Sequence, residues 1–155
     1  MNPTTFSRIL IAIDGSDLAE KAGFTAVDLA QRYSGEVIIL HVAKYPPNTL
    51  GMNAQHAVSV GLPLADPLTE RLKKQAIASM DRVAAYASKS KVPSKKLVVD
   101  TSSAIAATIA DHAYRDEADL IVVGDTGTNE YRATLTGSVA EGIMHEARCA
   151  VMIVR

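Results

Sequence analysis

The sequence predicts a doubly wound α/β sandwich, in which helices cover both faces of a five-stranded parallel sheet. Strand-like and helix-like segments alternate from one end of the chain to the other, which is typical of consecutive β-α-β units. Hydrophobic residues make up 48% of the chain, aromatic residues only 5%, and tryptophan is absent. A core built mainly from Ala, Val, Ile and Leu suits helices that pack on a buried parallel sheet.

Five short aliphatic runs are the predicted strands. The first covers residues 8–13 and stops at Asp14-Gly15-Ser16, three residues that favour a turn. The other four cover residues 36–42, 96–99, 119–123 and 150–154. The segment 43–66, which contains three prolines and two glycines, separates the second strand from the next helix. Loops of that length are unusual in compact domains, so this one is expected to be a lid, a binding loop or disordered.

Apolar residues at steps of three or four predict four helices, at about 18–33, 67–88, 105–114 and 138–145. Asp17 and Glu20 form a plausible capping pair for the first, which Gly35 can end. Asp66 is the predicted N-cap of the second, with Pro67 as its first helical residue. Ser138 is the predicted N-cap of the last, and Glu141 three residues later would complete a capping box.

Length and charge limit the class of protein. The chain has 155 residues without a linker or a change in composition, so we expect one domain over residues 1–155. Sixteen Lys and Arg against seventeen Asp and Glu leave a net charge of −1, which argues against a nucleic-acid partner. No apolar run approaches the roughly 20 residues that cross a bilayer, so no membrane association and a cytoplasmic location are expected. The one cysteine, Cys149, is expected to be a small buried hydrophobe.

Three strand ends are the candidate site, because doubly wound sheets bind ligands beyond the carboxyl ends of their strands. They are 14–16 after the first strand, 41–43 after the second and the loop 124–138 after the fourth. In that loop, Gly124 and Gly127 would let main-chain N–H groups approach an anion, and Gly137 precedes a helix N-terminus that favours phosphate. The alternative is that these glycines only end a strand, form a turn and start a helix.

The spacing of this loop resembles a known family. Gly124, two residues, Gly127, nine residues and then Gly137-Ser138 resemble the G-x2-G-x9-G-[ST] phosphate loop of the ATP-binding subgroup of universal stress proteins. The resemblance extends along nearly the whole chain, with matching segments at residues 8–16, 40–42, 118–124 and 139–154. It implies a Rossmann-like sheet with strand order 3-2-1-4-5 and binding of an adenine nucleotide: ATP, or ADP or AMP, with Mg²⁺. It also implies a homodimer formed through the last strand, Ala150 to Val154.

The resemblance also assigns roles to residues at matching positions. Asp14 would face the adenine and ribose, and the main chain around Val42 would contact the edge of the adenine. Gly127, Gly137 and Ser138 would hold phosphates. The complete candidate set, in which Ala12 and Ile13 form a wall and Val139 the floor, is Ala12, Ile13, Asp14, Ser16, Val42, Gly124, Thr126, Gly127, Thr128, Gly137, Ser138 and Val139.

This loop departs from the family pattern in its charge. Family loops are small or basic between the glycines, whereas this one carries Asp125 and Glu130, with Arg132 as its only cation. Carboxylates next to a triphosphate are unfavourable unless they bind Mg²⁺ or point outward. None of the four histidines has a second histidine at metal-ligand spacing, and His41 is interpreted as a strand-end residue whose ring bonds a neighbouring backbone group.

Three functions remain open from the sequence. The first is a non-enzymatic regulator of a stress response that acts through nucleotide-dependent conformation and dimerisation. The second is a slow ATPase or autophosphorylating enzyme, for which Asp14, Asp125 and Glu130 are the available carboxylates. The third is a nucleotide-free dimerisation module that uses the face of Ala150, Met152 and Val154. Catalytic Ser-His-Asp and Walker A motifs are absent from the sequence.

Overall fold

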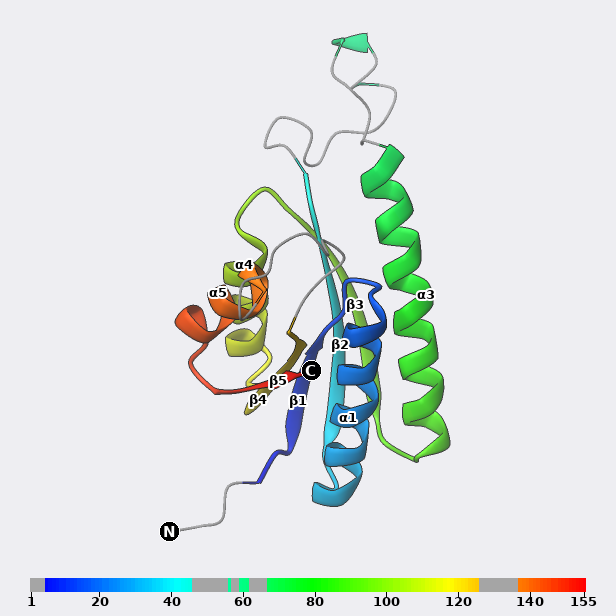
Figure 1. Ribbon diagram of the computed structural model, residues 1–155, viewed down its shortest axis with the longest axis vertical. Helices are drawn as coiled ribbons and strands as arrows, with labels where there is room; N and C mark the ends of the chain where they lie inside the picture. The colour runs from blue at the N-terminus through cyan, green and yellow to red at the C-terminus, as the bar shows by residue number, and fades with distance from the viewer. Residues whose placement is uncertain (1–4, 46–55, 57–58, 62–66, 126–136) are drawn as a thin grey trace.

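A computed structural model describes residues 5–45, 56, 59–61, 67–125 and 137–155. Five strands form one entirely parallel sheet in the order β3-β2-β1-β4-β5, which confirms the predicted fold class and strand order (Figure 1). The strands are β1 (Arg8–Ala12), β2 (Glu36–Lys44), β3 (Ser94–Thr101), β4 (Leu120–Gly124) and β5 (Ala150–Val154). The helices, with the labels of Figure 1, are α1 (Asp17–Tyr33), α3 (Pro67–Lys89), α4 (Ile105–Arg115) and α5 (Ser138–Glu146).

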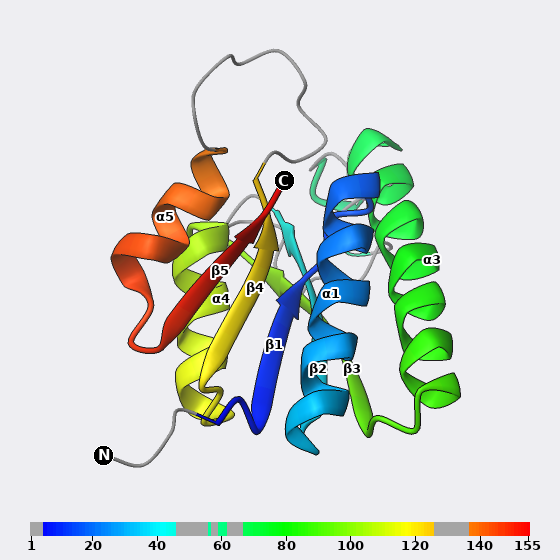
Figure 2. The same ribbon diagram turned by 60° about the horizontal axis from the view of Figure 1, so that its bottom comes forward.

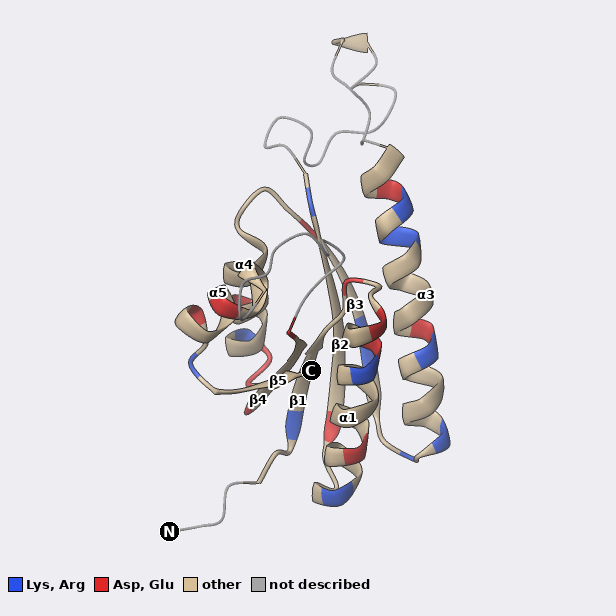
Figure 3. Cartoon of the chain, in the orientation of Figure 1, with Lys and Arg blue, Asp and Glu red and all other residues tan. Residues whose placement is uncertain are grey.

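The sheet is buried on both faces. Helices α1 and α3 cover one face, and α4 and α5 cover the other (Figure 2). Side chains of β1 alternate between the two layers: Ile9 and Ile11 pack under α1 and α3, whereas Leu10 packs under α4. Charged residues of the central strands lie only at the strand ends, at Arg8, Glu36 and Lys44 (Figure 3). The nearly continuous apolar runs follow from this double covering.

The edge strand β3 is longer than the predicted residues 96–99. It pairs with β2 over eight residues, from Val37↔Ser94 to Lys44↔Thr101. Two ion pairs tie it to α3: Lys96 to Asp81, and Lys73 to Asp100 at 2.8 Å. Its polar side chains face helix charges and solvent at the edge of the sheet, so hydrophobicity underestimates the length of the strand.

The predicted cap of α1 is wrong. Ser16 is the N-cap, and its side chain accepts the backbone N–H of Ala19 at 3.1 Å. Asp17 is the first helical residue, and the Glu20 carboxylate accepts from Arg82 of α3 at 2.6 and 2.9 Å instead of capping. This hydrogen bond to Arg82 lowers the pKa of Glu20. A serine and the acidic residue that follows it are both good N-caps, so the tertiary contact to α3 decides between them.

The predicted capping box of α5 is also wrong. Gly137 is the N-cap, with φ −62° and ψ 147°, and the helix has no side-chain cap hydrogen bond. Ser138 is therefore inside the first turn, one position later than predicted. The predicted N-cap Asp66 of α3 lies outside the described residues. Within the described part of the chain, no helix combines the length and the apolarity needed to cross a membrane.

Candidate functional site

A pocket of about 220 Å³ opens beyond the carboxyl ends of β1, β2 and β4, where the chain order of the sheet reverses. This is the location at which doubly wound sheets bind ligands. Of the predicted site residues, seven line it: Ala12, Ile13, Asp14, Val42, Gly124, Ser138 and Val139. Sequence positions 12 to 139 are thus brought to one place by the parallel register of the strands. Thr126, Gly127 and Thr128 lie outside the described residues.

The apolar wall of the pocket comes partly from residues that the sequence did not identify. Ile105 and Ile109 project from the start of α4, and Leu40 and Val123 come from the strand ends. All four belong to, or pack against, the core layer under α4 and α5. The periodicity of α4 predicts a buried helix face. Only the packed structure shows that residues of this face at the start of α4 line a cavity. A flat apolar ligand such as a nucleobase suits these walls.

Asp14 is held in place by its own turn. Its Oδ1 accepts the backbone N–H of Ser16 at 2.9 Å and the Ser16 hydroxyl at 2.7 Å. The same Ser16 oxygen accepts Ala19 N–H, so the carboxylate is connected to the N-terminus of α1. Ser16 is not among the residues that line the pocket. Its hydroxyl donates to a carboxylate that does line the pocket.

This cap geometry makes a prediction that separates two serines. Ser16→Ala removes the acceptor for Ala19 N–H and is expected to cost about 1 kcal/mol of folding stability. Ser138→Ala removes no side-chain cap and is expected to cost much less. Urea unfolding of both variants measures the difference. Equal losses, or a larger loss for Ser138→Ala, would contradict the assignment of the two caps.

His41 is buried, with 7% of its surface exposed. Its Nδ1 lies 2.7 Å from the carbonyl oxygen of Ile13. Because a carbonyl can only accept, Nδ1 carries the proton and donates it. The prediction that the His41 ring bonds a neighbouring backbone group is confirmed, although β2 continues beyond it to Lys44.

The base of the glycine-rich loop is closed by main-chain hydrogen bonds. Gly137 N–H donates to Asp125 O at 2.6 Å, and Asp125 N–H donates to Val154 O at 2.9 Å. The Asp125 carboxylate, which the sequence suggested would disfavour phosphate, bonds Arg155 Nε at 2.9 Å. Gly124 lets β4 approach α1 closely, since a Cβ there would lie 3.2 Å from the backbone of Leu18 and Ala19. Glu130 and Arg132 are outside the described residues.

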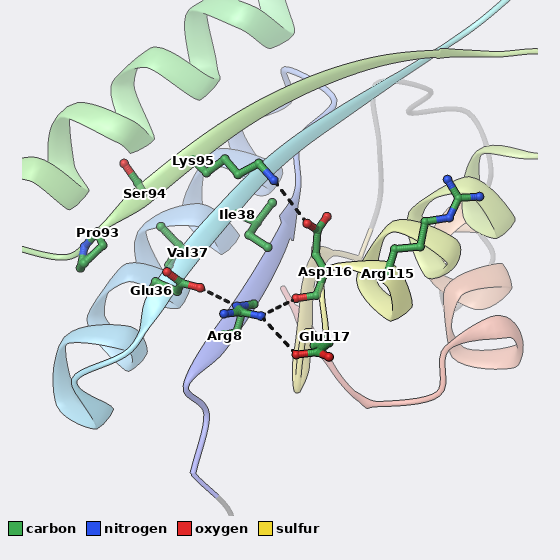
Figure 4. A pocket seen from close by; sticks show the side chains of 10 residues that line it. All are labelled: Arg8, Glu36, Val37, Ile38, Pro93, Ser94, Lys95, Arg115, Asp116 and Glu117. Atoms are coloured by element: carbon green, nitrogen blue, oxygen red, sulfur yellow. Dashed lines mark hydrogen bonds and ion pairs between the residues drawn. The ribbon is translucent and has the colours of Figure 1, made fainter.

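A charged hollow of about 380 Å³ lies at the opposite end of the sheet, next to the amino ends of the strands (Figure 4). Arg8 there bonds Glu36 and the carbonyl of Asp116, and Lys95 pairs with the Asp116 carboxylate at 3.3 Å. The hydrogen bond to Glu36 raises the pKa of Arg8. These groups satisfy one another across β1, β2, β3 and the turn after α4, so we interpret the hollow as an ion-pair network that joins these elements. The apolar pocket at the switch point remains the candidate site.

Metal ligands are not assembled in the part of the chain that the structure describes. In that part, no three His, Cys, Asp or Glu side chains come together as a metal ion would require. Cys149 is half-buried, and burial raises the pKa of its thiol.

Comparison with known proteins gives one consistent result. Residues 5–155 match the universal stress protein family. The chain is 30% identical to universal stress protein YxiE of Bacillus subtilis over 150 residues, which is 97% of this chain and 99% of that one. The structure of universal stress protein UspA from Lactobacillus plantarum superposes with a TM-score of 0.73 at 27% identity, covering 98% and 99% of the two chains. A universal stress protein of Archaeoglobus fulgidus, solved in complex with dAMP, superposes with a TM-score of 0.65 at 18% identity, covering 98% and 100%.

Proposed function

This chain belongs to the universal stress protein family, and on that premise we propose that it binds an adenine nucleotide in the switch-point pocket. We define this pocket as the 220 Å³ cavity lined by the ends of β1, β2 and β4 and the first turns of α4 and α5. The observation that carries the proposal is that an apolar slot, an oriented carboxylate and a helix N-terminus meet around one cavity. These are the groups that a nucleobase, a ribose and a phosphate respectively require.

The base is assigned to the apolar part of the pocket. Val42 and Val123 lie at the strand ends, and Ile105 and Ile109 face them from α4. Burial of an aromatic base between aliphatic side chains gives affinity without charge. The dAMP complex of the Archaeoglobus fulgidus relative supports an adenine base as the occupant.

The ribose is assigned to Asp14. A carboxylate accepts hydrogen bonds from sugar hydroxyls, and Asp14 lies where the chain turns from β1 into α1. Ser16 restricts its side chain through two hydrogen bonds, so little rotamer entropy remains to be lost on binding.

The phosphates are assigned to the N-terminus of α5. Its N-cap is Gly137, so no side chain caps the N–H groups of the first turn. Ser138 and Val139 of that turn line the pocket. The unpaired N–H groups of a helix N-terminus and the positive end of its dipole favour an anion. A volume of 220 Å³ suits a nucleoside better than a whole triphosphate, so further phosphates, with Mg²⁺ on their oxygens, would extend beyond the described lining of the pocket.

The contacts of the carboxylates favour binding over hydrolysis. Asp14 Oδ1 accepts from Ser16, and Asp125 Oδ2 pairs with Arg155. One oxygen of each carboxylate is thus engaged by a protein group, and Asp125 is not among the residues that line the pocket. We therefore propose a non-enzymatic regulator of a stress response, whose folded state is stabilised by the nucleotide. Release of inorganic phosphate from ATP by the purified chain would instead establish the slow ATPase.

The test of binding is direct. Ligand released by acid from freshly purified protein is identified by nucleotide chromatography and mass spectrometry. Stripped protein is then titrated calorimetrically with AMP, ADP and ATP, with and without Mg²⁺, and with GMP as a comparison. We expect about one adenine nucleotide per chain and a preference over GMP. Absence of binding by all three adenine nucleotides would refute the proposed function.

Dimerisation through β5 is proposed from its place at the edge of the sheet. Val154 O bonds Asp125 N–H, so Ala150, Met152 and Val154 direct their backbone groups to β4. By alternation, Val151 and Ile153 direct theirs to the outer edge, where a second copy can pair. Val151→Pro, which removes one outward N–H, is expected to weaken the dimer at least about tenfold. Sedimentation velocity over a concentration series measures it, and an unchanged monomer–dimer equilibrium would contradict this interface.

A further inference from the structure

The hydrogen-bond ladder between β1 and β2 stops one bond before its regular continuation. Ala12 pairs with Leu40, and Ile13 N–H donates to Leu40 O at 2.8 Å. In a regular parallel ladder the next bond would run from Val42 N–H to Ile13 O. The backbone hydrogen bonds of the described residues do not include that bond. Strand β2 nevertheless continues to Lys44, paired with β3 on its other side.

The missing bond has a specific replacement. Ile13 O, the acceptor that Val42 N–H would use, accepts instead from His41 Nδ1 at 2.7 Å. The imidazole of the residue before Val42 thus occupies the position of the ladder bond. Val42 lines the switch-point pocket. Its N–H points to the side of β2 on which β1 would lie if β1 continued beyond Ala12.

The carbonyl of Val42 points to the same side of β2 as its N–H, and it also lacks the β1 partner that a regular ladder would supply. In a regular ladder it would accept from Gly15 N–H. Gly15 has φ +89°, and the chain turns there from β1 toward α1. The turn and the histidine together leave Val42 with a donor and an acceptor side by side next to the pocket.

We propose that His41 is a positioning residue for base selection, which keeps Val42 N–H available for the ligand by occupying Ile13 O. This inference rests on the proposed function. Adenine presents an acceptor at N1 and an amino donor at N6, which match the N–H and C=O of Val42. Hypoxanthine presents an N–H at N1 and a carbonyl oxygen at position 6, the reverse arrangement. The chain therefore discriminates adenine from hypoxanthine, and His41 maintains that discrimination.

Two substitutions distinguish this role from simple packing of a buried ring. His41→Leu removes the donor and lets Val42 N–H bond Ile13 O. His41→Asn keeps a donor, because an asparagine side-chain amide occupies nearly the position of Nδ1. The matched pair separates loss of the hydrogen bond from loss of the ring.

The first measurement is amide hydrogen exchange of Val42 by NMR in nucleotide-free protein, which does not depend on binding. We expect fast exchange in the wild type and in His41→Asn, and exchange at least about tenfold slower in His41→Leu. The second is calorimetric titration with AMP and IMP. The ratio of AMP to IMP affinity is expected to fall at least about tenfold in His41→Leu and to be retained in His41→Asn.

The outcomes separate the two proposals. If the wild type binds no adenine nucleotide, the proposed function fails, while the exchange rates still decide whether His41 keeps Val42 N–H unbonded. If the wild type binds AMP but His41→Leu leaves both the Val42 exchange rate and the AMP to IMP ratio unchanged, the role of His41 is refuted. If His41→Leu does not fold, the wild type decides: a Val42 amide already protected without nucleotide overturns the inference, and one that AMP protects supports it.

Discussion

Gly137→Val is expected to weaken AMP binding at least about 100-fold while the fold remains intact. Gly137 is the N-cap of α5, and its φ of −62° and ψ of 147° are accessible to valine. A branched side chain there would occupy the space in front of the first N–H groups of the helix. Hydrogen bonds to a charged group contribute about 1.5–3 kcal/mol each, so loss of two accounts for this decrease.

Calorimetry with two ligands checks this prediction. AMP should lose its affinity for the Gly137→Val variant, whereas adenosine, which lacks the phosphate, should bind as it does to the wild type. Thermal unfolding without nucleotide should give similar melting temperatures for the two proteins. Wild-type affinity of the variant for AMP would show that the phosphate does not lie at the N-terminus of α5.

Gly15→Ala is expected to lower the free energy of unfolding by about 2–5 kcal/mol. Gly15 has φ +89°, which L-residues rarely adopt, and forcing one into such a conformation costs about 1–3 kcal/mol. In addition, a Cβ would lie 2.9 Å from the backbone nitrogen of Ala76 and 3.1 Å from the backbone carbon of Gln75. Helix α3 would have to move away as a unit, because a backbone contact cannot be relieved by a change of rotamer.

The chain offers a matched control in Gly61. Its φ is +70°, and a Cβ there would meet nothing within 4 Å. Gly61→Ala therefore carries the backbone strain without the contact with α3. Urea unfolding of the two variants isolates the contribution of the contact to α3. A loss for Gly15→Ala no greater than that for Gly61→Ala would contradict the close packing of the turn against α3.

The order of the elements could be predicted because it depends on local patterns. An aliphatic run such as residues 8–13 predicts a strand without knowledge of the segments that pack against it. Strands that alternate with helices allow few topologies, because the connections between parallel strands are right-handed. The candidate site could be located for the same reason. Parallel strands bring their carboxyl ends to one edge, so Asp14, Val42 and Gly124 had to lie near one another.

The caps could not be predicted to the residue. Ser16 and Asp17 are both good N-caps, and so is Ser138, although the structure places Gly137 there. The choice depends on contacts distant in sequence: Glu20 is drawn to Arg82 of α3, and Gly137 N–H is bonded to Asp125 O. The pairing of Asp125 with Arg155 is equally non-local, because it joins the ends of β4 and β5.

The sequence by itself determined the α/β class and the end of the sheet that carries the pocket, since periodicity and glycine spacing are properties of the chain. The strand order was implied by the resemblance to a known family. Only the tertiary structure decided which groups are available there. Ile105 and Ile109 become a pocket wall because α4 packs beside the ends of β2 and β4. Val42 N–H makes no hydrogen bond to β1, and Ile13 O, which a regular ladder would offer to it, accepts from the His41 ring instead. Hydrogen bonds compete for a limited number of acceptors, and that competition is settled only when distant segments meet.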